Sequence, residues 1–225
     1  MNNSPAPVIA IDGPSGSGKG AVSSSVARQF GFHLLDSGAL YRLLGIAVHR
    51  AGISLGDVEE VAALARSLDI EFSARDPGAV TLNGEDVSLA IRTDLGSDMA
   101  SRAGAIPAAR EALMERQLAF RQPPGLVADG RDMGTVVFPD AVVKIYLTAT
   151  VEERAQRRYK QLIDKGIDAI LPALLQDLKE RDARDSERQI SPLKPAADAI
   201  VLDTTEMSEQ QVINRVTDIV TRSLR

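Results

Sequence analysis

One glycine-rich stretch limits the folds open to this chain more than any other feature. Residues 13–22 read GPSGSGKGAV, in which Gly13 and Lys19 stand at the spacing typical of a loop that cradles phosphates. The apolar run VIAID (8–12) before it is typical of a buried parallel strand, and residues 19–30 after it have helical spacing. Because the stretch joins a strand to a helix, the sequence favours a nucleotide site over a plain glycine-rich turn.

The chemistry of this stretch suits phosphate groups. Glycines let the backbone come close to oxygen atoms and turn successive N–H groups toward an anion, and the following helix adds the positive end of its dipole. Lys19 would place a positive charge on the terminal phosphates. We therefore expect a phosphate-bearing cofactor to be bound by Gly13, Pro14, Ser15, Gly16, Ser17, Gly18, Lys19, Gly20 and Ala21.

The end of the stretch departs from the general pattern. Gly20 and Ala21 follow Lys19, where the pattern has Ser or Thr with a hydroxyl that contacts magnesium. The next hydroxyl belongs to Ser23, about one helical turn along. Two alternatives stay open: magnesium is held mainly through water and other oxygen atoms, or Ser17 and Ser23 compensate.

Further strand–helix pairs predict an α/β fold in which helices flank a parallel sheet. The run FHLLD (32–36) precedes a helical segment for which Ser37 is placed as the N-cap and Gly52 as the stop. Buried-strand character returns at 125–130, 141–147 and 198–204. Ser208 is placed as the cap of a closing amphipathic helix.

Two segments depart from this alternation, so we expect one domain over residues 1–225 with excursions at 57–105 and 151–190. In the first, 69–73 and 79–82 alternate apolar and polar residues on either side of DPG (76–78), and Asn83-Gly84 leads into EDV. This pattern predicts a small antiparallel meander.

Helical spacing is evident in two further segments. Residues 94–121 predict two helices, the second of which begins at Pro107. Residues 151–188 are highly charged and mostly helical, with a break near Gly166 and Pro172.

Composition excludes several classes of protein. The formal net charge of -5 argues against a general nucleic-acid binder. The chain has no cysteine, which excludes disulfides, thiolate metal sites and cysteine nucleophiles and suits a reducing cytoplasm. No secretory signal and no apolar run of about 20 residues is visible. We expect a cytoplasmic protein that binds no membrane, and a monomer, because no heptad pattern or large exposed apolar helix face is evident.

Charged side chains stand where strands of the predicted sheet end. Asp12 and Asp129 end two buried strands, a place where carboxylates commonly hold magnesium beside phosphates, and the alternative for each is a loop cap. In DGRDMG (129–134), Arg131 and Asp132 lie at the edge where open α/β sheets bind ligands, and the alternative is a salt-bridged loop.

Arginines are grouped on the charged helical segment. Arg154, Arg157 and Arg158 share one predicted helix face, and a second face is formed by Arg181, Arg184 and Arg188. These arginines suit phosphate recognition, although the pairs Glu180–Arg184 and Arg181–Asp185 would also fit a solvated helix with ion pairs. His33 and His49 have no neighbours at ligand spacing, so we expect no metal centre made of protein side chains alone.

Five stretches in order along the chain resemble bacterial cytidylate kinases, which are nucleoside monophosphate kinases of the P-loop class. They are IDGPSGSGKG, LLDSGALYR, EDVSLAIRT, VADGRDMGTVVFPDA and KERDARDSER. The resemblance implies a P-loop-type sheet, an acceptor-binding insertion near 57–105 and a helical lid near 151–190. It also implies phosphoryl transfer from ATP to the small molecules CMP or dCMP, with Mg2+.

The resemblance also implies roles for individual residues. ATP phosphates would be bound by Gly13 to Lys19, and Arg157 would lie in the lid that closes over ATP. The acceptor would be held by Ser37, Arg42, Ser101, Arg110, Arg131, Asp132, Arg181, Asp185 and Arg188. The residues expected to take part in the transfer itself are Lys19, Arg131, Asp132, Arg181 and Arg188. Family members usually have Thr where this chain has Ala21.

Two other functions remain compatible with these residues. One is a P-loop kinase for a different small acceptor, such as UMP or a non-nucleotide alcohol, although the DSGALYR segment (36–42) favours CMP. The other is a nucleotide-sensing module without turnover, in which Ala21 would abolish catalysis. The retained arginines favour catalysis, because a sensor needs no second phosphate-binding crevice.

Overall fold

The computed structural model describes residues 5–72, 79–164 and 166–224. The chain divides into two compact units. The first runs to Asp36 and resumes at Gln117, and the second comprises Ser37–Arg116. The predicted excursion at 57–105 lies inside the second unit, which also includes helix α2 and most of helix α5. The DPG segment (76–78) lies outside the described residues.

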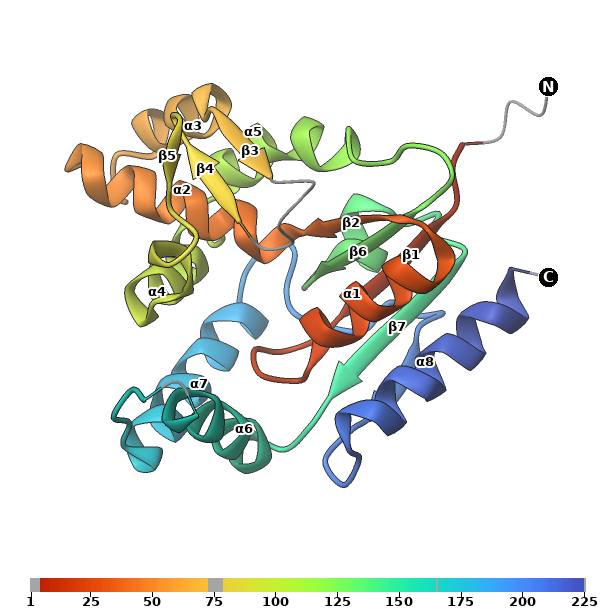
Figure 1. Ribbon diagram of the computed structural model, residues 1–225. Coiled ribbons are helices and arrows are strands. Elements are labelled where there is room, and N and C mark those ends of the chain that lie inside the picture. The colour runs from red at the N-terminus through yellow and green to blue at the C-terminus, as the bar shows by residue number, and fades with distance from the viewer. Residues whose placement is uncertain (1–4, 73–78, 165, 225) are drawn as a thin grey trace. The chain divides into compact units, whose positions relative to one another are not determined.

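A parallel five-stranded sheet is the centre of the first unit, in the order β2-β6-β1-β7-β8. Figure 1 labels β2, β6, β1 and β7 of this sheet. Its strands are β1 (Val8–Asp12), β2 (His33–Asp36), β6 (Leu126–Gly130), β7 (Val143–Thr148) and β8 (Ile200–Asp203). All five residues of β1 are buried, as the apolar run predicts for a strand with parallel neighbours on both sides. The predicted α/β class with a parallel sheet is confirmed.

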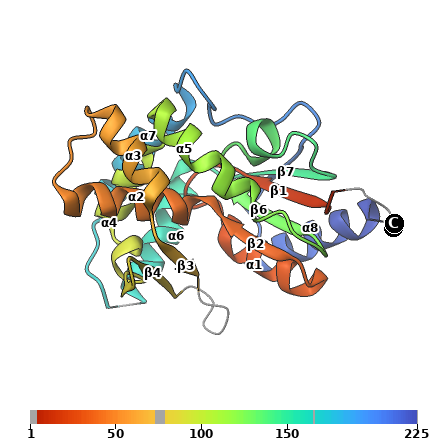
Figure 2. The ribbon, with the colours of Figure 1, turned by 90° about the horizontal axis from the view of Figure 1, so that it is seen from above.

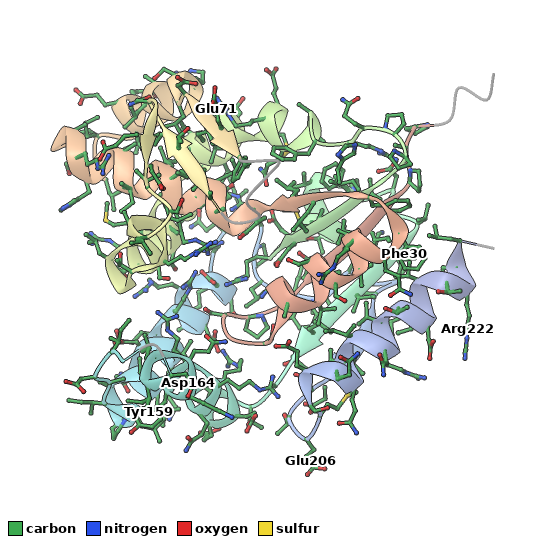
Figure 3. All side chains as sticks on the ribbon, viewed as in Figure 1. Phe30, Glu71, Tyr159, Asp164, Glu206 and Arg222 are labelled. Carbon is green, nitrogen blue, oxygen red and sulfur yellow. The ribbon has the colours of Figure 1, made fainter. Side chains whose placement is uncertain are left out.

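Helices α1 (Lys19–Phe30) and α8 (Glu209–Ser223) lie side by side over one face of this sheet (Figures 1 and 2). Their apolar residues form one core with the strands, and Phe30 packs against it (Figure 3). Ser208 caps α8 as predicted, because its hydroxyl accepts the Gln211 N–H while the Gln211 side chain accepts the Ser208 N–H.

The charged segment folds into helices α6 (Val151–Ile163) and α7 (Leu171–Ser186), which pack against each other. Between them Gly166 has a positive φ of 71°, so the predicted break is present there. Pro172 lies in the first turn of α7 rather than in the break, a position where its missing N–H costs no helical hydrogen bond. A single π-helical turn, η2 (Met133–Val137), follows β6.

The second unit combines helices with a three-stranded antiparallel sheet, in the order β3-β4-β5. The strands are β3 (Ile70–Phe72), β4 (Val80–Leu82) and β5 (Glu85–Asp86), and Asn83 and Gly84 both have positive φ, as the predicted Asn-Gly turn requires. The helices are α2 (Ser37–Ala51), α3 (Val58–Ser67), α4 (Asp94–Ala103) and α5 (Pro107–Leu118), with the 3-10 turn η1 (Ala90–Arg92) before α4. Helix α2 begins at Ser37 itself, one residue earlier than predicted.

Candidate active site

The glycine-rich loop connects β1 to α1 at the centre of the parallel sheet. Gly13, Gly16 and Gly18 have φ values of 149°, 77° and 91°. A Cβ atom at Gly13 would lie 2.0 Å from the Leu147 carbonyl oxygen of β7, so only glycine fits there. The start of the loop therefore packs against strand β7. The positive φ values at its glycines are those with which successive N–H groups can point toward a bound anion.

Lys19 is held inside this loop. Its side chain is 6% exposed, and Nζ donates to the Pro14 carbonyl oxygen at 2.8 Å and to Ser17 Oγ at 3.5 Å. Burial and, next, the positive charge of Arg131 lower the pKa of Lys19 to about 7. The Lys19 amine therefore lies beside the loop backbone and is partly deprotonated near neutral pH. A bound phosphate would favour its protonated, charged form.

Asp12, at the end of β1, binds the backbone of the DGRDMG segment. Its Oδ1 accepts the Met133 N–H and its Oδ2 accepts the Gly134 N–H, both at 2.8 Å. Burial raises the pKa of Asp12 to about 7, although these two hydrogen bonds oppose the rise. These two hydrogen bonds are those of the loop-cap alternative, and the magnesium alternative stays a prediction.

Three arginines converge on one buried carboxylate. Asp185 of α7 is 1% exposed and receives Arg131 Nε at 3.2 Å, Arg188 Nη2, and Arg181 Nε at 3.9 Å. Burial alone would raise the pKa of Asp185, but the charges of Arg131, Arg188 and Arg181 outweigh it and lower the pKa. One buried carboxylate thus faces three guanidinium groups, which hold it in its charged form.

Ion pairs of the predicted kind are present on helix α7. The predicted Arg181–Asp185 pair is one of them, and Glu180 accepts a hydrogen bond from Gln176 at 2.8 Å. Arg131 is salt-bridged as well, but its partner comes from α7 and not from its own loop.

The predicted acceptor residues Ser37, Arg42, Ser101 and Arg110 lie on helices of the second unit. Ser37, Ser101 and Arg110 are buried. The Arg110 guanidinium carbon lies 5.4 Å from the centre of the Tyr41 ring, a cation–π contact, and Nη1 donates to the Gly104 carbonyl oxygen at 3.2 Å.

The profile of the family described as "Cytidylate kinase" matches residues 9–222 of this chain. The chain belongs to the cytidylate kinase family. A cytidylate kinase of Pseudomonas putida (strain W619) is 57% identical over 217 residues, which cover 95% of each chain. A cytidylate kinase of Bordetella bronchiseptica is 56% identical over 213 residues, covering 95% of this chain and 94% of the other. The resemblance stated from the motifs is thereby confirmed.

Arg157, expected in the lid of this cytidylate kinase family member, joins α6 to the loop after β8. Its Nε donates to Glu153 Oε1 at 2.9 Å, and its Nη1 and Nη2 donate to Thr204 Oγ1 at 3.1 Å and to the Thr204 carbonyl oxygen at 2.5 Å. Thr204 itself is fully buried.

Sequence reasoning placed Arg154 on an arginine face suited to phosphate recognition without giving it an individual role, and it did not assign Asp182 or Thr204 to the site. Arg154 is 4% exposed and bonds to the glycine-rich loop at the Ser15 carbonyl oxygen. Its place on the arginine-bearing face of 151–163 was the available signal. Asp182 and Thr204 carry no such signal, because their partners are distant in the sequence.

The surroundings of Ser17 and Ser23 bear on how magnesium would be held. Ser23 is fully buried, and its hydroxyl has no hydrogen-bond partner within the described part of the chain. Ser17 Oγ donates to the Pro14 carbonyl oxygen at 3.1 Å. Neither hydroxyl is directed to solvent, which favours the alternative in which water and other oxygen atoms hold the metal.

Proposed function

We propose that the chain transfers the terminal phosphoryl group of ATP to CMP or dCMP, giving ADP and CDP or dCDP. The names of the relatives support the acceptor, and buried Lys19 inside a loop at the carboxyl end of β1 supports the donor. This placement of Lys19 is the main support for the proposal. Burying an amine costs free energy, and a glycine-rich turn without a ligand would not require it.

The residues of the first unit account for the chemistry. Two phosphate-bearing substrates repel each other, and Lys19 with the guanidinium groups of Arg131, Arg181 and Arg188 would offset that repulsion. The attacking oxygen belongs to an ionised phosphate, so positioning and charge suffice without a strong general base. Closure of α6 and α7 over ATP would exclude water and limit hydrolysis.

Magnesium would accompany ATP and neutralise charge on its phosphates. Among the described residues, no group of three or more His, Asp or Glu side chains could hold a metal ion by itself. Asp129 lies close enough to the glycine-rich loop to help hold the metal, since a Cβ at Gly20 would lie 3.8 Å from Asp129 Oδ2. We infer that Asp129 meets the metal through water.

The wider assignments stay predictions: Ser37, Arg42, Ser101 and Arg110 as acceptor residues, a monomer, and a place in the cytoplasm. No helix among the described residues is long and apolar enough to cross a membrane.

The test is an assay of ADP release from ATP and Mg2+ with CMP, dCMP, UMP, AMP or no acceptor. We expect turnover largely confined to CMP and dCMP. Arg188→Ala and Arg131→Ala should lower it at least about tenfold, whereas Arg222→Ala, on the exposed side of α8, should not. ATP binding without acceptor-dependent turnover would instead establish the sensing module.

A further inference from the structure

We propose that Arg154 is a positioning residue that couples helices α6 and α7 to the glycine-rich loop and sets the loop's affinity for ATP. This inference rests on the proposed function only in taking the loop as the ATP site. The family resemblance implies no individual role for Arg154.

Arg154 is buried at the start of α6, where an arginine needs partners to offset the loss of water. Its Nε donates to the Ala149 carbonyl oxygen at 3.0 Å, and its Nη1 donates to the Ser15 carbonyl oxygen at 3.0 Å. Nη1 and Nη2 also donate to the two oxygens of Asp182, at 3.2 and 2.5 Å. The fork of one guanidinium thus joins the loop, the end of β7 and helix α7.

The bond to Ser15 orients a peptide of the loop. Because a trans peptide directs its C=O and its N–H to opposite sides, holding the Ser15 carbonyl against Arg154 directs the Gly16 N–H away from it. The loop also packs on α6 here, since a Cβ at Gly16 would lie 3.2 Å from Arg154 Cβ. An N–H group of the expected phosphate cradle is therefore oriented by a residue outside the loop.

Helix α7 provides Asp182, the carboxylate that binds Arg154. Asp182 and Asp185 are three residues apart, so they lie on neighbouring positions of one helix face. Asp182 binds Arg154, and Asp185 binds Arg131 and Arg188. One helix therefore links the glycine-rich loop to the arginine cluster, and a displacement of α7 is transmitted to the loop through Arg154.

Arg154→Lys tests the coupling. Lysine keeps the charge, but its single ammonium cannot reproduce the forked contacts with Ser15, Ala149 and Asp182. We expect the dissociation constant of ATP, measured by calorimetry, and the KM for ATP to rise about tenfold, as for loss of a charge-assisted hydrogen bond. The KM for CMP should stay within about twofold. Amide exchange in 13–18 should become faster, and exchange in β6 should not.

Arg121→Lys is the matched control. Arg121 binds a carbonyl and a carboxylate in the same way, with Nε 2.7 Å from the Ala6 oxygen and Nη1 2.8 Å from Asp140 Oδ2. It should lower the Tm without changing ATP affinity. Asp182→Asn, which keeps one acceptor oxygen, should weaken ATP binding in the same direction and serves if Arg154→Lys does not fold.

Two outcomes would overturn the inference. One is an ATP affinity within about twofold of wild type in Arg154→Lys or, if that variant does not fold, in Asp182→Asn. The other is an equal rise of the constants for ATP and CMP. Failure of the proposed function is separate, because it would appear as absent CMP turnover in the wild-type protein while ATP binding still reported on Arg154.

Discussion

Two buried charges at the end of β1 and the start of α1 have pKa values displaced in opposite directions, mainly by burial. The pKa of Asp12 rises to about 7 and that of Lys19 falls to about 7. Lys19 therefore loses its proton near neutral pH in the ligand-free protein. Phosphate groups favour the charged amine and would raise this pKa again, so binding and protonation are linked.

Calorimetry of ATP binding at pH 8 should detect that linkage. Above a pKa of about 7, Lys19 of the free protein is largely neutral, and bound phosphates return its proton, so ATP affinity should fall as pH rises above 7. Titrations in two buffers of different ionisation enthalpy should show uptake of about one proton per ATP. Lys19→Met should remove this uptake; equal uptake by both proteins would contradict the linkage.

The capping contact of Asp12 predicts a loss of stability in Asp12→Asn. Asparagine offers one acceptor oxygen, so either the Met133 or the Gly134 N–H is left buried without its partner, at a cost of about 1–3 kcal/mol. Urea unfolding at pH 4 measures the loss, because near that pH the raised pKa of about 7 keeps Asp12 neutral in the folded protein, so the substitution does not also remove a buried charge. Asp198→Asn, which weakens the pair with Lys144, is the control and should cost clearly less, because the Asp198 side chain is 66% exposed, although that of Lys144 is only 10% exposed. Equal losses of unfolding free energy in the two variants would contradict a stabilising role for the Asp12 cap.

At the scale of elements, the loop between β1 and α1 takes its shape from a neighbouring strand. The Leu147 carbonyl of β7 leaves no room for a side chain at Gly13, whereas Gly20 lies in the first turn of α1 with space around it. The neighbouring strand thus requires glycine at position 13, whereas the helix would accept a side chain at position 20.

Gly13→Ala and Gly20→Ala should therefore have opposite effects. Gly13→Ala places Cβ 2.0 Å from a carbonyl oxygen and should cost more than about 3 kcal/mol. Gly20→Ala removes a poor helix former and should stabilise by up to about 1 kcal/mol. Thermal unfolding of the pair measures both effects. Similar shifts of Tm in the same direction would contradict this account.

At the scale of the whole molecule, each compact unit has a hydrophobic core of its own. One core is built from residues between Ala39 and Leu113, all within the second unit. The other joins β1, β6 and β7 to α1 and α8, all within the first unit. The apolar interactions in these two cores therefore act within units, and local opening of one unit need not expose the core of the other.

Leu44→Ala should consequently loosen one unit alone. Leu44 is fully buried in the core of the second unit, and its truncation should cost about 2–5 kcal/mol. Native-state hydrogen exchange should become faster across 37–116 and remain slow in β1 and β6. Ile145→Ala, in the core of the first unit, should give the reverse pattern. Uniform acceleration in both variants would show that the units open together.

Local patterns determined much of this protein in advance. The buried run at 8–12, the glycine-rich loop and the Asn-Gly turn each predicted the observed element, because periodicity and turn chemistry act over a few residues. The motifs also led to the family. Helix α3 was missed, since its buried positions are Val61, Ala62 and Ala65, of which two are small. The π-helical turn at 133–137 was missed because its Asp12 cap comes from another strand.

Only the tertiary structure gives the charged residues their partners. The sequence left Asp12 as a magnesium ligand or a cap, and the arginines as phosphate ligands or ion pairs. Contacts across 121 residues for Asp12 and 139 for Arg154 gave each its partners. Such contacts depend on which strands and helices become neighbours, and the residues on either side of a charge in the sequence carry no record of that choice.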